Sequence, residues 1–75
     1  SRLVRYLRRR DLFKKYSKQS ELLEQNIKHP SLNTEKLNPK EFGLYSFRID
    51  RKYRAIFTVT GQGEIEIVDI NDHYK

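Results

Sequence analysis

A chain of 75 residues with no cysteine and a net charge of +6 makes one small domain, residues 1–75. The missing cysteine excludes a disulfide framework and a zinc–thiolate site, and it fits a cytoplasmic protein. No apolar run approaches the roughly 18 residues that span a membrane, and no signal-peptide pattern occurs, so no membrane partner is expected.

The basic charge lies almost entirely in the first eighteen residues. That segment holds eight Lys and Arg side chains against one Asp, which is +7, whereas the rest holds eight bases and nine acids, which is −1. A concentration of this kind attracts polyanions, nucleic acid first. An exposed helix face rich in Arg and Lys would have the same composition.

Two helices are expected before residue 30. Apolar side chains at steps of three and four predict an amphipathic helix over residues 3–17, although "RLVRY" could instead form a short strand. Ser20 is a plausible N-cap for a second helix that ends before Pro30. Residues 1–29 are therefore expected to form a helical hairpin.

The second half of the chain alternates as strands do. Residues 31–43 are predicted to be a loop, and a meander follows over 44–71, with turns at 50–52 and at "TGQG", where Gly61 is free to take a positive φ. In the third strand the apolar residues change parity, which suggests a bulge or burial on both faces. The fold class is α+β: a helical hairpin packed on a three- to four-stranded antiparallel sheet in two layers.

A three-residue turn at 50–52 would place Arg48 directly opposite Arg54. Like charges across a ladder are destabilising, and a phosphate between the two guanidinium groups would relieve the repulsion. In the next hairpin, pairing across Gly61 and Gln62 would place Arg54 opposite Asp69, and the two side chains would make an ordinary cross-strand ion pair. The tail, residues 72–75, then brings His73 and Tyr74 towards Arg54.

Arginines, a histidine and a tyrosine around one phosphate suggest phosphodiester cleavage without a metal. Histidine suits acid or base work near neutral pH, and arginines stabilise the developing charge. The two histidines lie far apart in sequence and there is no Cys, so no zinc ligand set is present. A lone histidine near a terminus is, by itself, more often a surface residue.

The segments "LYSFRIDRKYRAIF" and "DINDHYK", with "HPSLNTEKL" before them, resemble the RelE/ParE superfamily of bacterial type II toxins. The likeness is greatest to the YoeB type, which carries a His-Tyr pair near its C-terminus. It covers roughly residues 20–75. The resemblance implies a metal-independent, cofactor-free mRNA interferase that cuts messenger RNA in the A site of the 30S ribosomal subunit, and a cognate antitoxin that neutralises it.

The resemblance also implies roles for individual residues. Arg54 matches the phosphate-stabilising arginine, His73 the general acid, and Tyr74 the neighbouring tyrosine. Arg48 falls where relatives carry a basic residue on the preceding strand. Glu35 falls near the glutamate that serves as general base in the His-Tyr branch, although an exposed loop carboxylate is an equal reading.

The chain departs from the family in two respects. Members usually begin with a β-strand, which here is absent, short or hidden in "RLVRY". Relatives of the RelE type carry Lys on the first hairpin strand, where this chain has Ser46 and Phe47, so Arg48, Lys36 or Lys40 would supply the basic contacts. Further RNA contacts are expected from the basic helices, at Arg9, Arg10 and Lys14.

Two other functions remain open. A ParE-type toxin inhibits DNA gyrase by binding and has no catalytic step, but such chains generally lack the C-terminal His-Tyr pair. A degenerate homologue would only bind nucleic acid or antitoxin. The pair His73-Tyr74 favours the nuclease.

Overall fold

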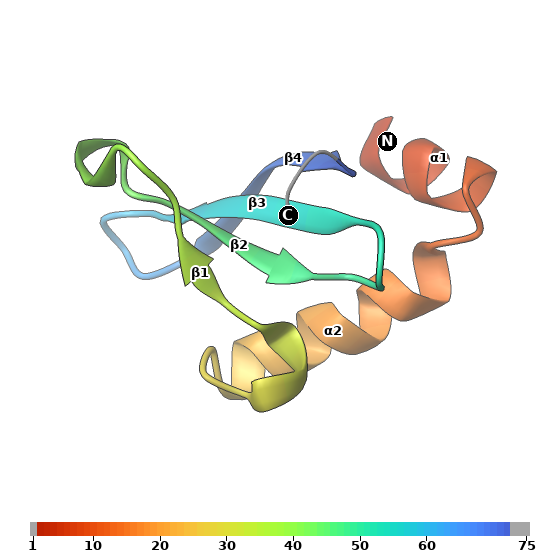
Figure 1. Cartoon of the computed structure of the whole chain (residues 1–75), viewed down its shortest axis with the longest axis horizontal. Helices are drawn as coiled ribbons and strands as arrows, with labels where there is room; N and C mark the ends of the chain where they lie inside the picture. Colours follow the sequence, from red (N-terminus) through yellow and green to blue (C-terminus); the bar gives the residue numbers. More distant parts are fainter. Residues whose placement is uncertain (1, 73–75) are drawn as a thin grey trace.

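The computed structural model describes residues 2–72 as two helices and a four-stranded antiparallel sheet of order β1-β2-β3-β4 (Figure 1). The helices are α1 (Arg2–Arg9) and α2 (Phe13–Gln25), with short 3-10 turns η1 (Pro30–Leu32) and η2 (Lys40–Phe42). The strands are β1 (Glu35–Lys36), β2 (Leu44–Arg48), β3 (Arg54–Val59) and β4 (Ile65–Asn71). Helix α2 lies against one face of the sheet, which confirms the predicted α+β class in two layers.

The predicted helix boundaries were wrong. Asp11 adopts a left-handed conformation with φ of 56°, which ends the first helix and lets the chain turn before α2. This turn buries both Leu7 and Leu12 in the core, and a continuous helix through residue 17 would not. Ser20 lies inside α2 and caps nothing, and "RLVRY" is helical.

The fourth strand comes from the segment that was predicted to be a loop. Within residues 31–43, Glu35 pairs with Ser46 and Lys36 pairs with Tyr45, so β1 extends the sheet beside β2. Two residues are too few for a periodic signal in the sequence. The segment that precedes β2 in the sequence therefore supplies an edge strand of the sheet.

The register between β2 and β3 is the predicted one. Ile49 N–H donates to the Tyr53 carbonyl at 2.9 Å, and Arg48 lies opposite Arg54. The register between β3 and β4 was wrong by two residues, because Arg54 pairs with Asn71 and not with Asp69.

Two local features account for that shift. The turn is longer than predicted, with Thr60 N–H donating to the Glu64 carbonyl, and Gly63 rather than Gly61 takes the positive φ. The predicted bulge is present: Val68 has no partner on β3, between the pairs Phe57–Ile67 and Ile56–Asp69. Each of these two features adds one residue, so Arg54 pairs with a residue of β4 two positions further along than predicted.

The core lies between the sheet and the helices. Its centre is Phe47, which is fully buried and whose ring lies 6.2 Å from Tyr16 of α2 and 5.9 Å from Phe57 of β3. The other buried hydrophobic members are Leu7, Leu12, Leu23, Leu32, Ile49, Ala55, Phe57 and Ile70. Ring contacts across the layers fix α2 beneath the strands.

Gln19 ties α2 to the end of β2. Its buried amide nitrogen donates to the Arg48 carbonyl at 2.8 Å and to the Ser31 carbonyl at 3.0 Å. We expect Gln19→Ala to lower the free energy of unfolding by about 1–3 kcal/mol, because two carbonyls in partly buried hydrogen bonds lose their donor. Urea denaturation measures this loss. Gln25→Ala, at an exposed position of the same helix, should change stability by under about 0.5 kcal/mol, and equal losses in both variants would contradict this role.

Candidate functional site

Two arginines face each other on the sheet face opposite to the helices. Arg48 ends β2 and Arg54 begins β3, and they occupy directly paired positions of the ladder. Phe47 and Ala55, one position further along, are buried against the helices. Since side chains alternate along a strand, both arginines lie on the open face.

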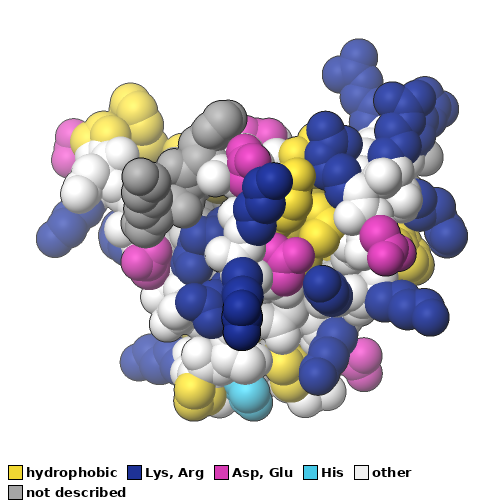
Figure 2. All heavy atoms as spheres, turned by 45° about the vertical axis from the view of Figure 1, so that its right-hand side comes forward, with side chains coloured by type: hydrophobic (Ala, Val, Ile, Leu, Met, Phe, Trp, Pro, Cys, Tyr) yellow, Lys and Arg dark blue, Asp and Glu magenta, His cyan; other side chains and the backbone are white. Residues whose placement is uncertain are grey.

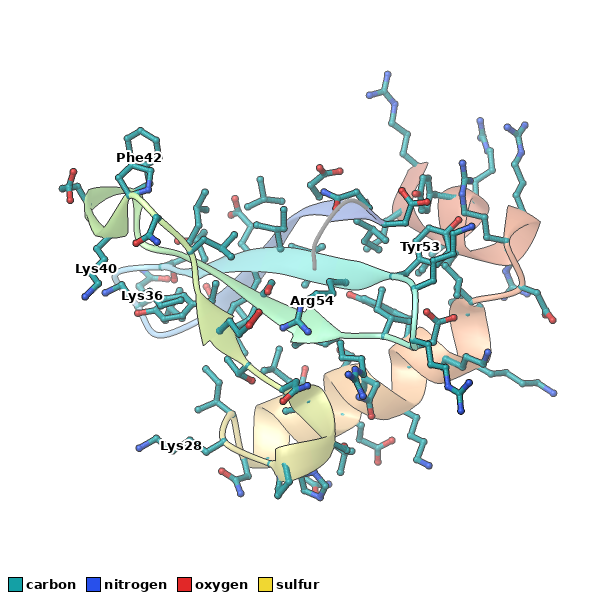
Figure 3. The ribbon with its side chains drawn as sticks, in the orientation of Figure 1. Lys28, Lys36, Lys40, Phe42, Tyr53 and Arg54 are labelled. Carbon is teal, nitrogen blue, oxygen red and sulfur yellow. The ribbon has the colours of Figure 1, made fainter. Side chains whose placement is uncertain are left out.

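Arg54 is held by a set of hydrogen bonds to its neighbours. Its Nε donates to Ser46 Oγ at 3.0 Å, and its Nη2 donates to the Ser46 carbonyl at 3.2 Å and to the Asn33 carbonyl. Only 11% of the side chain is exposed. Figure 3 shows the guanidinium lying across β2 towards β1. Its position is therefore fixed before any ligand arrives.

The carboxylate nearest to Arg54 comes from β1. Glu35 Oε1 lies 3.6 Å from Arg54 Nη2, and the Glu35 side chain is 56% exposed. Burial lowers the pKa of Arg54, Glu35 raises it, and Arg48 lowers it. Arginine nevertheless stays protonated in proteins, so the site keeps a fixed cation, and the attraction of Glu35 for this cation outweighs the repulsion from Arg48.

These residues surround a small pocket of about 200 Å³. Its lining is Asn33, Glu35, Arg48, Asp50, Arg51, Lys52 and Arg54. Within the described part of the chain, four cationic side chains therefore meet two carboxylates in this pocket. The excess of positive charge and the fixed guanidinium fork suit a phosphate group.

No family model matches the sequence, and neither does any curated protein. The fold is similar to the solved structure of a YoeB/ParE toxin from Agrobacterium tumefaciens, with a TM-score of 0.72 and 20% sequence identity. The match covers 93% of this chain and 85% of that one. The chain has that toxin's fold.

The structure brings together three of the five predicted catalytic residues: Arg54, Arg48 and Glu35. His73 and Tyr74 lie outside the described residues. The predicted alternative, an Arg54–Asp69 ion pair, is wrong, because the Val68 bulge and the longer turn move Asp69 opposite Ile56. Asp69 instead accepts hydrogen bonds from Ile70 N–H and Asn71 Nδ2.

The predicted RNA-binding lysines lie away from the Arg54 pocket. Lys36 Nζ is 5.5 Å from the centre of the Tyr45 ring, and Lys40 is in η2. Figure 3 shows Lys28, Lys36 and Lys40 on the other side of β1 from Arg54. An RNA strand that contacted both these lysines and the Arg54 pocket would have to cross β1.

The predicted contacts in the helices form a separate basic surface. Arg9 and Arg10 line a pocket of about 360 Å³ beside α1, and Arg10 lies 3.7 Å from the centre of the Tyr6 ring. Lys14 is exposed on α2. Figure 2 shows Lys and Arg side chains gathered at the upper right, around α1. This basic surface and the Arg54 pocket are distinct.

Sequence reasoning did not identify Ser46 and Asn33 as parts of the site. Ser46 was read only as a departure from a family pattern, yet it is fully buried and supplies two acceptors to Arg54. The available signal was a small polar residue, Ser46, two positions before Arg48 and therefore on the same face of β2. Asn33 contributes a main-chain carbonyl from a left-handed position with φ of 48°, for which asparagine is a favoured residue.

Among residues 2–72, no three His, Asp or Glu side chains gather as a metal ligand set. No helix in the described part of the chain is both long and apolar enough to cross a membrane.

Asp50 makes folding stability depend on pH. Burial raises the pKa of Asp50, but the N–H groups of Tyr53 and Lys52 and the ammonium of Lys15 outweigh it and leave the pKa below 3.8. The unfolded chain therefore binds this proton more readily, so the charged form stabilises the fold above about pH 4 and the benefit disappears as pH falls through the folded pKa.

We expect Asp50→Asn to be less stable than the wild type at pH 7 and to lose less of its free energy of unfolding on acidification. Asparagine keeps an oxygen acceptor for the two N–H groups, so the substitution mainly removes the charge. Urea denaturation between about pH 2 and pH 7 measures the difference. Parallel curves for the two proteins would contradict the assignment.

Proposed function

We propose that this protein is the toxin of a type II toxin–antitoxin system, and that it cleaves messenger RNA on the ribosome without a metal. The observation that carries the proposal is the Arg48–Arg54 pair, with Arg54 fixed by Ser46 and Asn33 in a cationic pocket. The fold likeness to a YoeB/ParE toxin supports the same reading.

In this proposal the scissile phosphate sits between the two arginines. The 2′-oxygen bonds to phosphorus while the bond from phosphorus to the 5′-oxygen breaks, which leaves a 2′,3′-cyclic phosphate and a 5′-hydroxyl. The two guanidinium groups stabilise the extra negative charge of the phosphorane. Because Arg54 is already oriented, little reorganisation is needed when the phosphate binds.

Glu35 and His73 would move the two protons. A phosphate oxygen that bound Arg54 Nη2 would replace Glu35, whose ion pair at 3.6 Å is loose, and would free its carboxylate to accept the 2′-hydroxyl proton. His73 would protonate the leaving 5′-oxygen, with Tyr74 beside it. Asn71 pairs with Arg54 and precedes His73 by two positions in the sequence, which supports this assignment.

The basic surface around α1 would contact ribosomal RNA through Arg9, Arg10 and Lys14. Positive charge of this density supplies affinity for a phosphate backbone without sequence preference. Lys36 and Lys40 would contact the message itself. We propose a cytoplasmic location and an antitoxin with a disordered acidic segment, which would fold against the basic toxin surface.

Expression in a bacterial host tests the proposal. Induction should arrest growth unless the antitoxin is present, and mapped RNA 5′ ends should fall within translated codons. His73→Ala should reduce cleavage by about a hundredfold or more, as expected for loss of a general acid. Arrest without new RNA ends, together with loss of gyrase supercoiling in vitro, would replace this proposal with a ParE-type gyrase inhibitor.

A further inference from the structure

A second, larger pocket opens beneath the β1 edge of the sheet. It has a volume of about 420 Å³ and is lined mainly by apolar atoms. Ile27, Pro30 and Tyr45 contribute to its walls, and Lys28 and Lys36 also line it. Among residues 2–72, no carboxylate lines this pocket, and Glu35 belongs to the pocket on the other face of the sheet.

The two pockets meet at one residue. Asn33 lines both of them, and its carbonyl holds Arg54 in place. Asn33 lies just before β1, so a ligand that occupied both pockets would cross the outer edge of the sheet beside this residue. Figure 3 agrees, since Arg54 lies on one side of β1 and Lys28 and Lys36 lie on the other.

Tyr45 offers an aromatic surface in the second pocket. Phe57 stacks on its ring, with centres 5.5 Å apart and planes 22° apart, so one face is covered and the ring cannot easily tilt. Lys36 Nζ lies over the ring at 5.5 Å from its centre. Lys36 of β1 and Phe57 of β3 are the cross-strand neighbours of Tyr45 on its two sides, so the ammonium approaches from the side away from Phe57. A lysine side chain is flexible and can yield this face to a flat ligand.

We propose that this pocket binds the nucleobase of the nucleotide next to the phosphate held by Arg54. The base would stack on Tyr45 in place of the Lys36 ammonium, and Lys28 and Lys36 would contact the adjacent backbone phosphate. The inference rests on the proposed function, because it takes the ligand of the Arg54 pocket to be an RNA phosphate. An aromatic platform next to lysines is the usual arrangement for binding single-stranded RNA.

A cycle of ligand and protein variants tests the subsite. The probe is a tetranucleotide of 2′-O-methyl RNA, which lacks the attacking hydroxyl, either complete or with one abasic residue on the 5′ or the 3′ side of its central phosphate. For the wild type, an abasic residue on one of the two sides should weaken binding about tenfold. Against Tyr45→Leu the complete and the abasic probes should bind equally.

Two further variants guard against a folding artefact. Tyr45 is half-buried, so Lys28→Ala/Lys36→Ala is tested beside it; this double variant should weaken the complete probe about tenfold or more and leave the melting temperature unchanged. Lys18→Ala removes an exposed charge from α2 that lines neither pocket, and it should weaken binding much less.

The outcomes separate the subsite from the proposed function. If both abasic probes bind the wild type as tightly as the complete probe, while Arg54→Gln weakens all three, the base pocket is wrong and the phosphate site stands. If the base-dependent difference is present but cells show no new RNA ends, the subsite stands and the nuclease is wrong. Absence of binding by every probe would overturn the subsite.

Discussion

Arg54→Gln should reduce RNA cleavage by about a hundredfold or more and should abolish growth arrest. Loss of one pre-positioned group that stabilises transition-state charge typically reduces the rate by factors of about 10²–10³. Glutamine can still donate a hydrogen bond to Ser46 but carries no charge, so Arg48 is then the one cation left of this pair. Rates are measured on programmed ribosomes, beside growth curves after induction.

A control must separate lost charge from lost structure, because Arg54 also anchors the segment that carries Glu35. Arg51→Gln removes the same charge from the same pocket, but Arg51 is an exposed turn residue, and we expect less than about a fivefold change in rate. Thermal melts should show that Arg51→Gln is as stable as the wild type, and that Arg54→Gln, which loses hydrogen bonds to two carbonyls, is less stable but still folded at the assay temperature. Full cleavage by a folded Arg54→Gln protein would refute the phosphate role.

Phe47→Ala should leave the chain largely unfolded at 37 °C. Phe47 is completely buried, and its ring contacts both Tyr16 and Phe57, so truncation leaves a cavity between the sheet and α2. Such substitutions cost about 3–5 kcal/mol, which approaches the whole stability of a domain this small. Urea denaturation followed by circular dichroism at low temperature measures the loss.

Val59→Ala is the matched control for Phe47→Ala. Val59 is also in the sheet, on β3, but it is 42% exposed, so the same kind of truncation should cost about 0.5 kcal/mol or less. A core role for Phe47 requires a large difference between the two variants. Similar midpoints would mean that the sheet and α2 are not held together through this ring.

The sheet could be predicted because its information is local. Alternating residues from Tyr45 to Val59 determine which side of each strand is buried, and a short turn then forces Arg48 opposite Arg54. The Arg48–Arg54 half of the candidate site follows directly from that register. The end of β4 could not be placed in the same way, since an extra turn residue and a bulge each change the register without altering the composition.

The remaining elements depend on contacts that are distant in sequence. Asp11 takes a left-handed conformation because Leu7 and Leu12 must both reach the core, and no periodic pattern announces such a break. Strand β1 is two residues long and pairs with Ser46 and Tyr45 of β2, and its Glu35 lies beside the Arg54 side chain. Its Glu35 could therefore be proposed from a resemblance but not placed from the residues alone.

The bulge at Val68 gives β4 one residue more than the stretch of β3 that it pairs with. Before it, Ile67 points towards the core, and after it Ile70 does so, although three positions separate them. Deleting Val68 would remove the bulge and leave regular pairing, because Ile67, Asp69 and Ile70 would then follow one another opposite Phe57, Ile56 and Ala55, with Ile70 still facing the core. The bulge therefore accommodates one additional residue between the hairpin turn and Asn71 while Ile67 and Ile70 both keep facing the core.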